Sequence, residues 1–539
     1  MPRTVKVAVI GSGLAGLTAA HLLASQTHSD REVDFEVHLF EKAAMLGMDS
    51  ASVSIRNFGK QEWRVDVPMR SFQGGYYPRL IALYEKLGIP FRQRDFSYSF
   101  SSYSRLADKT PLQTTLIYNG TSGRKGLGIP AWMKDLHLRR PRYALLTRAF
   151  VFVLFIFSTL QFLVCYVRLL LFAVPALRST RHNEYTFREW VEDTTPRSLV
   201  ARVLRFDCVW RSFTEDVLIP LFSAVCTAPE ESINAHPVEE FLDYIWLTLG
   251  THHYVVTKGV RDAVRHLTTN IKNIHLSARI VGLESDSSDR RLVAIEYSTG
   301  SGTKIARGFH HVVFATQASR AVPLLATYAA DLPAESAAKH AVMAQIQCLE
   351  SFHYVRTVVV NHTDDSNTLL PSDRRDRRDL NLVAAAQPTR DALNAWSPHR
   401  VAPTHAMTTH VLEPPPGFGY DRPVFQTTNP FVDILDDRIL SVATLERAVL
   451  TPASKAALRR LCVQTRRKWW QSSAEAEYAV GDLQGAGRMA SGASAGIWIC
   501  GSYAHAGIPL LEGCVVSARN VYQAICKTEG LLPGHASYF

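Results

Sequence analysis

A six-residue glycine pattern near the N-terminus constrains the fold more than any other feature of the chain. The β-branched run Val5–Ile10 leads directly into Gly11-Ser12-Gly13-Leu14-Ala15-Gly16, and a helix-forming stretch follows to Ala24. In a dinucleotide-binding unit the first glycine allows a tight turn, the second lets the backbone approach a pyrophosphate, and the third permits close helix–strand packing. The N-terminus of such a helix offers N–H groups and a partial positive charge to phosphates. The pattern predicts a Rossmann-type start.

The segment after this helix supplies the second half of the expected βαβ unit. Phe35–Phe40 has the composition of a second strand, and it ends in Glu41, followed by Lys42. An acidic residue at that strand end is where a ribose hydroxyl is held in dinucleotide folds. The alternative is a chance glycine-rich turn, which does not explain why strand, helix and acid occur in register. We therefore predict that residues 11–16, Glu41 and Lys42 bind a cofactor.

Composition limits what the rest of the chain can be. Its 539 residues suffice for two or three domains or one interleaved enzyme, and an apolar fraction of 47% suits a sizeable core. The net charge of +10 is not gathered into an aromatic-interleaved basic stripe, so we expect no nucleic-acid partner. The eight cysteines lack ligand-like spacing, which predicts neither zinc nor disulfides and favours a reducing compartment. We expect no signal peptide, because the first strand begins almost at once.

One apolar segment is long enough to interact with a membrane. Ala149–Val167 carries no charge over 19 residues, and a helix of that length nearly matches a bilayer core of about 30 Å. Arginines flank it, which suits anionic lipid headgroups: Arg139, Arg140, Arg142 and Arg148 before it, and Arg168, Arg178 and Arg181 after it. A full hairpin needs about 40 residues, more than the 29 in Ala149–Leu177.

A single crossing would place the N-terminal glycine loop and the C-terminal part of the site on opposite sides of the bilayer. We therefore expect a monotopic helix, or a short re-entrant pair, that dips into one leaflet from the cytoplasmic side of an intracellular membrane. A buried core helix of a substrate domain is the alternative.

The last part of the chain contains a second glycine-rich segment. Ile497–Gly501 has the pattern of a strand that ends in glycine, and a loop over 502–513 leads into a small-residue helix over Cys514–Ala524. His505 lies in this loop, and its pKa class suits proton transfer, so we predict it as a catalytic residue. A histidine that only bonds the loop backbone is the alternative.

At this point the chain resembles the flavin-dependent amine oxidase and phytoene desaturase superfamily, which pairs an N-terminal βαβ unit with a C-terminal strand, loop and helix beneath the flavin. Val65–Met69, Ala278–Leu283 and Val313–Thr316 are similar to other segments of that superfamily. The resemblance implies non-covalent FAD, and it implies that further residues contact the cofactor: Met69, Ile280, Ala315, Thr316, Gly501, Ser502, Gly507, Ile508, Pro509, Leu510 and Leu511.

The likeness is greatest to a branch of predicted NAD/FAD-binding oxidoreductases, which has counterparts of Phe96–Ser101, Val359–Asp364 and Phe425–Pro430. Two departures matter. Gly47-Met48 replaces the paired glycines of the amine oxidases, and no active-site lysine is identifiable, since Lys339 and Lys455 both lie in helix-like surroundings. The second departure weakens amine oxidation as the specific activity.

We therefore predict a two-lobed α/β flavoprotein. Residues 1–80, 246–330 and 481–539 would form a Rossmann-like FAD-binding domain, and residues 81–245 and 331–480 an α+β substrate domain that carries the apolar segment 149–177. The predicted activity is FAD-dependent desaturation or double-bond isomerisation of a lipid or polyene, with a membrane surface as partner. Oxidation of a lipophilic amine and a non-catalytic, membrane-bound flavin sensor are the alternatives.

Overall fold

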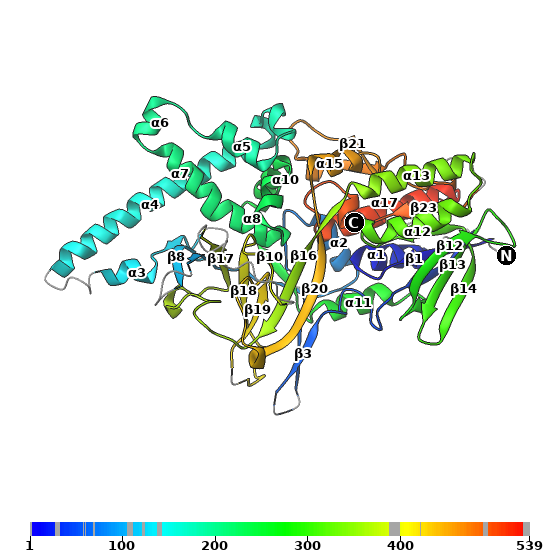
Figure 1. Cartoon of the computed structure of the whole chain (residues 1–539), viewed down its shortest axis with the longest axis horizontal. Helices are drawn as coiled ribbons and strands as arrows, with labels where there is room; N and C mark the ends of the chain where they lie inside the picture. The colour runs from blue at the N-terminus through cyan, green and yellow to red at the C-terminus, as the bar shows by residue number, and fades with distance from the viewer. Residues whose placement is uncertain are drawn as a thin grey trace.

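The protein is described by a computed structural model. It describes residues 3–26, 33–57, 59, 61–67, 71–104, 111–120, 124–136, 143–386, 399–420, 422–488 and 494–531. Two lobes lie side by side, each built on its own large sheet (Figure 1). The predicted two-lobed α/β architecture is confirmed.

The first lobe is built on a five-stranded parallel sheet whose strands come from three distant parts of the chain. Their spatial order is β11 (Asn273–His275), β2 (Val33–Phe40), β1 (Arg3–Ile10), β15 (His311–Phe314) and β23 (Gly496–Ile499). Side chains of β1 alternate between the two faces. Val5, Val7 and Val9 pack in one hydrophobic core, and Ala8 and Ile10 pack in another.

Helices cover both faces of this sheet, as a parallel sheet requires. The first core contains residues of α1 (Leu14–Ala24), α2 (Pro78–Lys86), α11 (Val260–Thr268) and α17 (Leu511–Thr528). The second contains residues of α12 (Ala318–Asp331) and α13 (Ala337–Glu350). An antiparallel sheet of β12 (Arg279–Ser285), β13 (Val293–Thr299) and β14 (Gly302–Phe309) packs on that side.

Residues Ile274–Leu283 have the composition of one strand, but they do not form one. The chain forms β11 and β12 in two different sheets, and Ser277 lies between them with φ = 50°. This left-handed conformation turns the chain and ends the first strand. The turn expected between Ser285 and Arg291 does join β12 to β13.

The second lobe is built on an eight-stranded mixed sheet. Its spatial order is β20 (Ile439–Val449), β16 (His353–His362), β19 (Val424–Thr428), β18 (Met407–Leu412), β17 (Leu380–Ala385), β7 (Tyr98–Tyr103), β8 (Leu112–Tyr118) and β9 (Leu127–Gly128). Between the two lobes lies a small sheet of β5 (Ser71–Gln73), β10 (His253–Val256) and β6 (Phe91–Gln93).

Smaller elements complete the two lobes. They are the hairpins β3 (Val53–Arg56) with β4 (Glu62–Val65) and β21 (Cys462–Arg466) with β22 (Glu477–Val480), and α15 (Pro452–Leu458).

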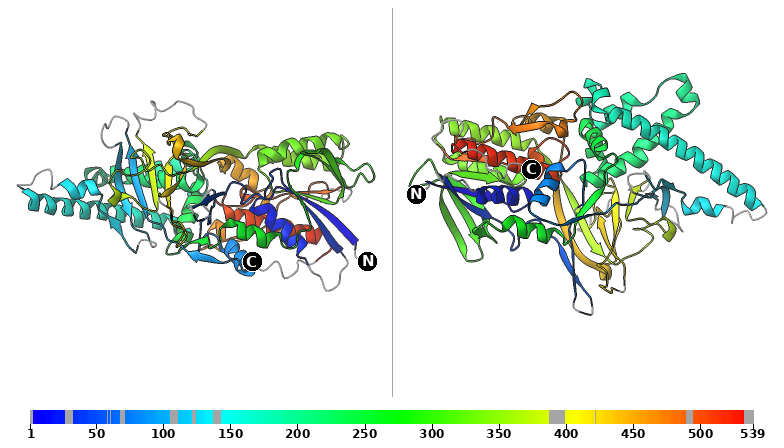
Figure 2. Two further views of the ribbon diagram at one scale, coloured as in Figure 1. Left: turned by 90° about the horizontal axis from the view of Figure 1, so that it is seen from below. Right: turned by 180° about the vertical axis from the view of Figure 1, so that it is seen from behind.

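A group of helices packs beside the eight-stranded sheet. It comprises α3 (Ala131–Lys134), α4 (Ala144–Ala173), α5 (Phe187–Thr194), α6 (Leu199–Val203), α7 (Phe206–Phe213), α8 (Ile219–Cys226), α9 (Glu230–Asn234) and α10 (Val238–Thr248). A π-helical turn, Thr214–Leu218, joins α7 to α8. The helix α4 extends beyond the body at the end opposite to the N-terminus, in Figure 1 and in both views of Figure 2.

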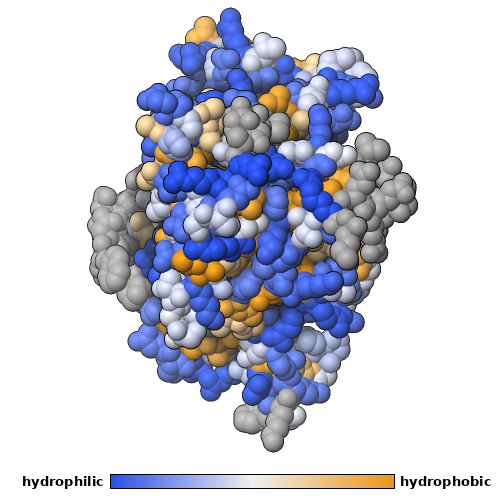
Figure 3. All heavy atoms as spheres, turned by 90° about the vertical axis from the view of Figure 1, so that its right-hand side faces the viewer, coloured by the Kyte–Doolittle hydropathy of each residue, from blue (hydrophilic) through white to orange (hydrophobic). Residues whose placement is uncertain are grey.

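The apolar segment therefore forms a single helix, and the suggested re-entrant pair is wrong. Residues 144–173 contain no glycine or proline, and the helix ends just before Pro175. The buried-helix alternative is also wrong, because only 11% of its most apolar window is buried. Among the described residues α4 is the helix long and apolar enough to cross a membrane. The face at the other end of the molecule is mainly hydrophilic (Figure 3).

Candidate flavin site between the two lobes

The glycine loop has the geometry that a dinucleotide needs. Gly11 has φ = 99°, and a Cβ there would lie 2.8 Å from the carbonyl oxygen of Ala315. A Cβ on Gly16 would lie 1.9 Å from the Gly11 carbonyl oxygen, so α1 can approach β1 only without one. A Cβ on Gly13 would meet nothing within 4 Å, which leaves open space beside the loop. The N-terminus of α1 has no side-chain cap. These features fit a bound pyrophosphate.

Glu41 holds this loop in place. One of its carboxylate oxygens accepts hydrogen bonds from the Ser12 amide (3.1 Å) and hydroxyl (2.6 Å), and the other accepts from the Ala43 amide (2.9 Å). The Ser12 hydroxyl also accepts from the Gly47 amide at 2.8 Å. A Cβ on Gly47 would lie 2.7 Å from the Ser12 carbonyl oxygen, so a residue with a side chain would clash with the glycine loop at this position. The acid predicted to contact ribose is thus buried and also orders the phosphate loop.

The C-terminal loop is fixed by a tyrosine of the first lobe. The amide of Ile508 donates to the Tyr76 hydroxyl at 2.9 Å, and a Cβ on Gly507, whose φ is 99°, would lie 2.7 Å from that oxygen. Behind the loop, the Ser517 hydroxyl contacts both the amide and the carbonyl of Gly501 at 3.0 Å. The N-terminus of α17 has no side-chain cap, and its positive end lies at the cavity described next.

A cavity of about 370 Å³ lies where the two lobes meet. Its first wall comes from the nucleotide-binding lobe and comprises Gly13, Leu14, Gly47, Met48, Ser502, Pro509, Leu510, Leu511 and Cys514. A second group of lining residues comes from the substrate lobe: Phe96, Tyr98, Leu221, Ala224, Val225, Thr227, Tyr244, Leu380, Leu382, Thr408, His410, Gln426, Thr428 and Arg447. The small sheet contributes Ser71, Phe72, Gln73 and His253, and Tyr77 follows β5 of that sheet in the chain. The cavity thus joins the glycine loop and the α17 N-terminus to the substrate lobe.

Burial keeps most titratable groups of this cavity neutral. It lowers the pKa of His253 and of His410 to about 4, so both imidazoles are uncharged at neutral pH. Burial also raises the pKa of the Tyr77, Tyr98 and Tyr244 phenols far above neutrality. These groups can donate and accept hydrogen bonds to a bound molecule without carrying charge.

The structure brings most of the predicted cofactor residues together. Leu14, Ser502, Pro509, Leu510 and Leu511 line the cavity, as does Gly13. Ala315 and Thr316 lie directly under Gly11, and the hydroxyl of Tyr503 donates to the Thr316 carbonyl at 3.1 Å. Ala15 belongs to the first turn of α1.

Two further predicted cofactor residues, Ile280 and Lys42, are also not among the described residues that line the cavity. Ile280 lies in β12, two residues beyond Ala278, whose amide bonds the Glu41 carbonyl at 2.8 Å. Lys42 is exposed, and Met69 falls outside the described residues.

His505 does not lie at the cavity. It is buried with its Nδ1 3.7 Å from the Cys462 sulfur and its ring edge-on to Tyr478. Burial, with a smaller contribution from the charge of Arg519, lowers the pKa of His505 to about 3. A proton-transfer role for His505 stays a prediction, and this environment does not support it.

Sequence reasoning missed most of the substrate-lobe wall. Gln426 and Thr428 lie within Phe425–Pro430, a segment that the family resemblance includes without giving these two residues a role. His253, His410 and Arg447 come from three separate strands, and neither spacing nor periodicity connects them. Phe96 and Tyr98 follow an alternation of aromatic and polar residues, which is a local pattern that predicts a strand with one apolar face.

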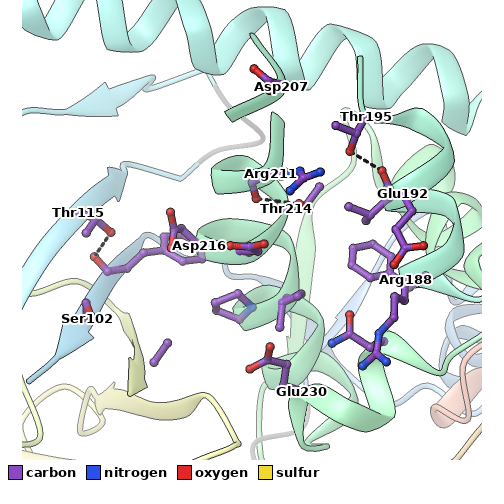
Figure 4. A pocket seen from close by; sticks show the side chains of 18 of the residues that line it. Ser102, Thr115, Arg188, Glu192, Thr195, Asp207, Arg211, Thr214, Asp216 and Glu230 are labelled. Carbon is purple, nitrogen blue, oxygen red and sulfur yellow. Dashed lines mark hydrogen bonds between the residues drawn. The ribbon is translucent and has the colours of Figure 1, made fainter. Parts of the chain in front are cut away.

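A second cavity, of about 860 Å³, lies between α5, the α7–α8 segment and the eight-stranded sheet (Figure 4). Charged residues of both signs line it: Arg188, Arg197, Arg202 and Arg211, with Glu192, Asp207, Glu215, Asp216 and Glu230. Leu382 lines both cavities. The glycine loop and α17 do not contribute to this second cavity, so it is not the cofactor site.

Comparisons with known proteins agree with this architecture. Residues 9–87 match the family model for an NAD(P)-binding Rossmann-like domain. No curated protein matches the sequence significantly. The structure of an alanine-to-cysteine variant of putrescine oxidase is similar over 97% of this chain and 99% of its own, with 12% identity and a TM-score of 0.50. Wild-type putrescine oxidase bound to putrescine gives 12% identity, 97% and 100% coverage and a TM-score of 0.49. The chain has a two-lobed fold similar to that of putrescine oxidase.

Proposed function

We propose that the chain is an FAD-dependent oxidoreductase that acts on a hydrophobic substrate, by desaturation or double-bond isomerisation of a lipid or polyene. The observation that carries this proposal is the cavity between the lobes. It joins a dinucleotide-type glycine loop and a helix N-terminus to an apolar wall that includes Phe96, Leu221 and Leu382. FAD bound there would accept hydride at its ring system, which is chemistry that the protein itself does not supply.

The protein's contribution is binding, orientation and exclusion of water. The α1 N-terminus would hold the pyrophosphate, and the α17 N-terminus favours negative charge near Leu510 and Leu511 by about 0.3–1 kcal/mol. The apolar side chains of the substrate lobe would hold a C–H bond close to the flavin and keep the site dry. Hydride transfer in this geometry needs no protein nucleophile.

No lysine is among the described residues that line the cavity. Lys455 is engaged elsewhere, because its ammonium group pairs with Glu239 at 2.6 Å and with Glu240 at 2.9 Å. A lysine was the residue expected for amine oxidation, so its absence from this wall supports a lipid or polyene substrate over an amine.

The exposed surface of α4 supports a membrane as the source of such a substrate. Along the helix, an exposed apolar stripe repeats every three or four residues: Leu146, Phe150, Val153, Phe157, Leu160, Val164, Val167 and Leu171. Cys165, Leu169 and Ala173 face the body instead. On α6 and just beyond it, Leu199, Val200, Val203 and Leu204 are also exposed. We propose that these surfaces enter the cytoplasmic leaflet of an intracellular membrane.

The proposal is tested by the visible absorption spectrum of the detergent-extracted protein, taken before and after anaerobic addition of a membrane lipid extract. A flavin band that survives purification and bleaches with lipid is the result expected for desaturation, whereas isomerisation would convert lipid to product without net bleaching of the band. A flavin band that does not respond to lipid, together with oxygen-dependent release of peroxide from a lipophilic amine, would replace lipid oxidation by amine oxidation. A stable flavin with no turnover of either substrate class would indicate a sensor, and a purified protein without flavin would contradict the proposal as a whole.

A further inference from the structure

Among the described residues that line the flavin cavity the permanent charge is positive, and this points to a substrate class. Resting on the function proposed above, we infer that the substrate is an anionic amphiphile whose carboxylate is bound by Arg447, and that a protonated amine is excluded. Arg447 is the one permanently charged residue among the described residues that line the cavity, and none of those residues is an aspartate or glutamate.

Arg447 lies at the junction of the two lobes. It belongs to β20, opposite Val355 of β16, and it lines the cavity together with Pro509 and Leu510 of the flavin loop. Its charge acts on two neighbouring groups, of which Tyr77 lines the cavity and Cys226 does not. Burial raises the pKa of the Cys226 thiol to about 12, and the Arg447 charge opposes that rise. Burial likewise raises the pKa of the Tyr77 phenol, again against the influence of Arg447.

The neighbouring carboxyl groups do not turn this site into a cation site. Glu512 influences Tyr77, but its two oxygens accept from the backbone amides of Arg79 and Leu80 at 2.9 and 3.0 Å, at the start of α2. Asp379 influences His410, but its Oδ2 accepts from the amide and hydroxyl of Ser97 at 2.9 and 2.6 Å. Asp95 influences His253, but it accepts from the Gln93 side-chain amide at 2.9 Å and from the His253 backbone amide at 3.2 Å. Glu413 influences His410, but it pairs with Arg94. These four carboxyl groups thus have partners of their own.

The two substrate classes therefore meet different environments. A carboxylate would gain charge-assisted hydrogen bonds from a guanidinium group, whose planar fork matches it, while its chain lies along Leu221, Leu380 and Leu382. An ammonium group would be buried beside a like charge, and the neutral imidazoles and phenols of the wall give it no counter-ion. The cavity therefore favours the anion through both an attraction and a repulsion.

Binding can be measured on the FAD-loaded protein without knowledge of the natural substrate. Octanoate, octanol and octylamine share one chain length, so titrating each while recording the flavin absorption spectrum isolates the effect of the headgroup. We expect octanoate to bind on the order of 10- to 100-fold more tightly than octanol, the range expected for hydrogen bonds to a charged group. We expect octylamine to bind most weakly. Equal affinities, or a preference for octylamine, would overturn the inference, whereas a protein without flavin would instead refute the proposed function.

Substitutions then assign the preference to Arg447. R447M should remove the octanoate preference and R447K should keep part of it, because lysine retains the charge but not the planar fork. R320M is the matched control: Arg320 is exposed on α12 and pairs with Glu446, the residue next to Arg447 in the chain. If R447M changes the reduction potential of the flavin but leaves the octanoate-to-octylamine ratio unchanged, the charge serves the cofactor and the inference is wrong.

Discussion

At the residue scale, Glu512 is a partly buried carboxyl group beside the candidate flavin site, and burial shifts its pKa. It lies in the first turn of α17, and its carboxylate accepts the two amides at the start of α2. Burial raises its pKa to about 7, and the hydrogen bonds from Leu80 and Arg79 only partly oppose this effect. One carboxyl group thus joins the N-termini of two helices and changes charge near neutral pH.

This shift predicts a pH dependence of stability. The folded-state pKa is above the unfolded value of 4.5, so the native state binds the proton more tightly, and unfolding free energy falls as pH rises from about 4.5 to about 7. The fall should amount to about 3 kcal/mol. E512Q should lose this part of the dependence in urea unfolding at pH 5 and pH 8, whereas the control E85Q, at an exposed position of α2, should keep it. An unchanged slope in E512Q would show that another group titrates.

The residues that could be predicted from the sequence are those under local constraint. Gly11, Gly16 and Glu41 act within a single βαβ unit, where spacing along the chain fixes spacing in space. Arg447 and His410 reach the same cavity only because eight strands pair in a particular order, and sequence separation says nothing about that order. Chemistry that depends on sheet register was therefore not predictable from one sequence.

At the element scale, α4 exposes large apolar side chains that no other part of the described chain covers. It has one side against Phe213, Trp210 and neighbouring residues, and its opposite stripe is apolar and exposed. Its existence and position followed from hydropathy. Its continuity follows from the absence of glycine and proline, because residues 144–173 offer no break at which a re-entrant pair could turn.

The stripe predicts how membrane binding responds to substitution. A triple variant, F150S/F157S/V164S, changes only side chains that are exposed in the protein, so it should fold normally. Its affinity for anionic liposomes in flotation should fall on the order of a thousandfold, because it removes three apolar side chains that would enter the lipid at about 1.5–3 kcal/mol each. V281S/I305S is the control, because both side chains are exposed and apolar on the β12–β14 sheet of the other lobe. Equal flotation of the triple variant would remove α4 as the anchor, and complete release of the wild type by carbonate would contradict insertion of α4 into a leaflet.

At the scale of the whole molecule, one buried carboxylate ties the two ends of the described chain together. Glu529, at the end of α17, contacts Arg3 of β1, His311 of β15 at 2.9 Å and Arg488 at 2.6 Å. Trp498 donates to the other nitrogen of His311 at 3.1 Å, so the neutral imidazole can donate to Glu529. Burial alone would raise the pKa of Glu529, but the His311 hydrogen bond and the neighbouring arginines lower it to about 2.

The sign of this second pH effect is opposite to that of Glu512. A depressed folded-state pKa contributes stability that is present above pH 4.5 and is lost as pH falls toward 2, by about 3 kcal/mol. In unfolding experiments at pH 6 and pH 3, E529Q should be less stable than the wild type at pH 6 and should lose less stability on acidification. E350Q, at the exposed end of α13, is the control. A parallel loss in E529Q and the wild type would contradict this assignment.

The order of the parallel sheet has a consequence for synthesis of the protein. Strand β23 and helix α17 are the last elements of the described chain, and both belong to the nucleotide-binding lobe. When α4 leaves the ribosome, more than 300 residues before them, the loop over 502–511 does not yet exist. The apolar helix is therefore available to a membrane before the pocket for the cofactor can close. Lipid contact can precede cofactor loading, and flavin retention reports that translation has run to the end of α17.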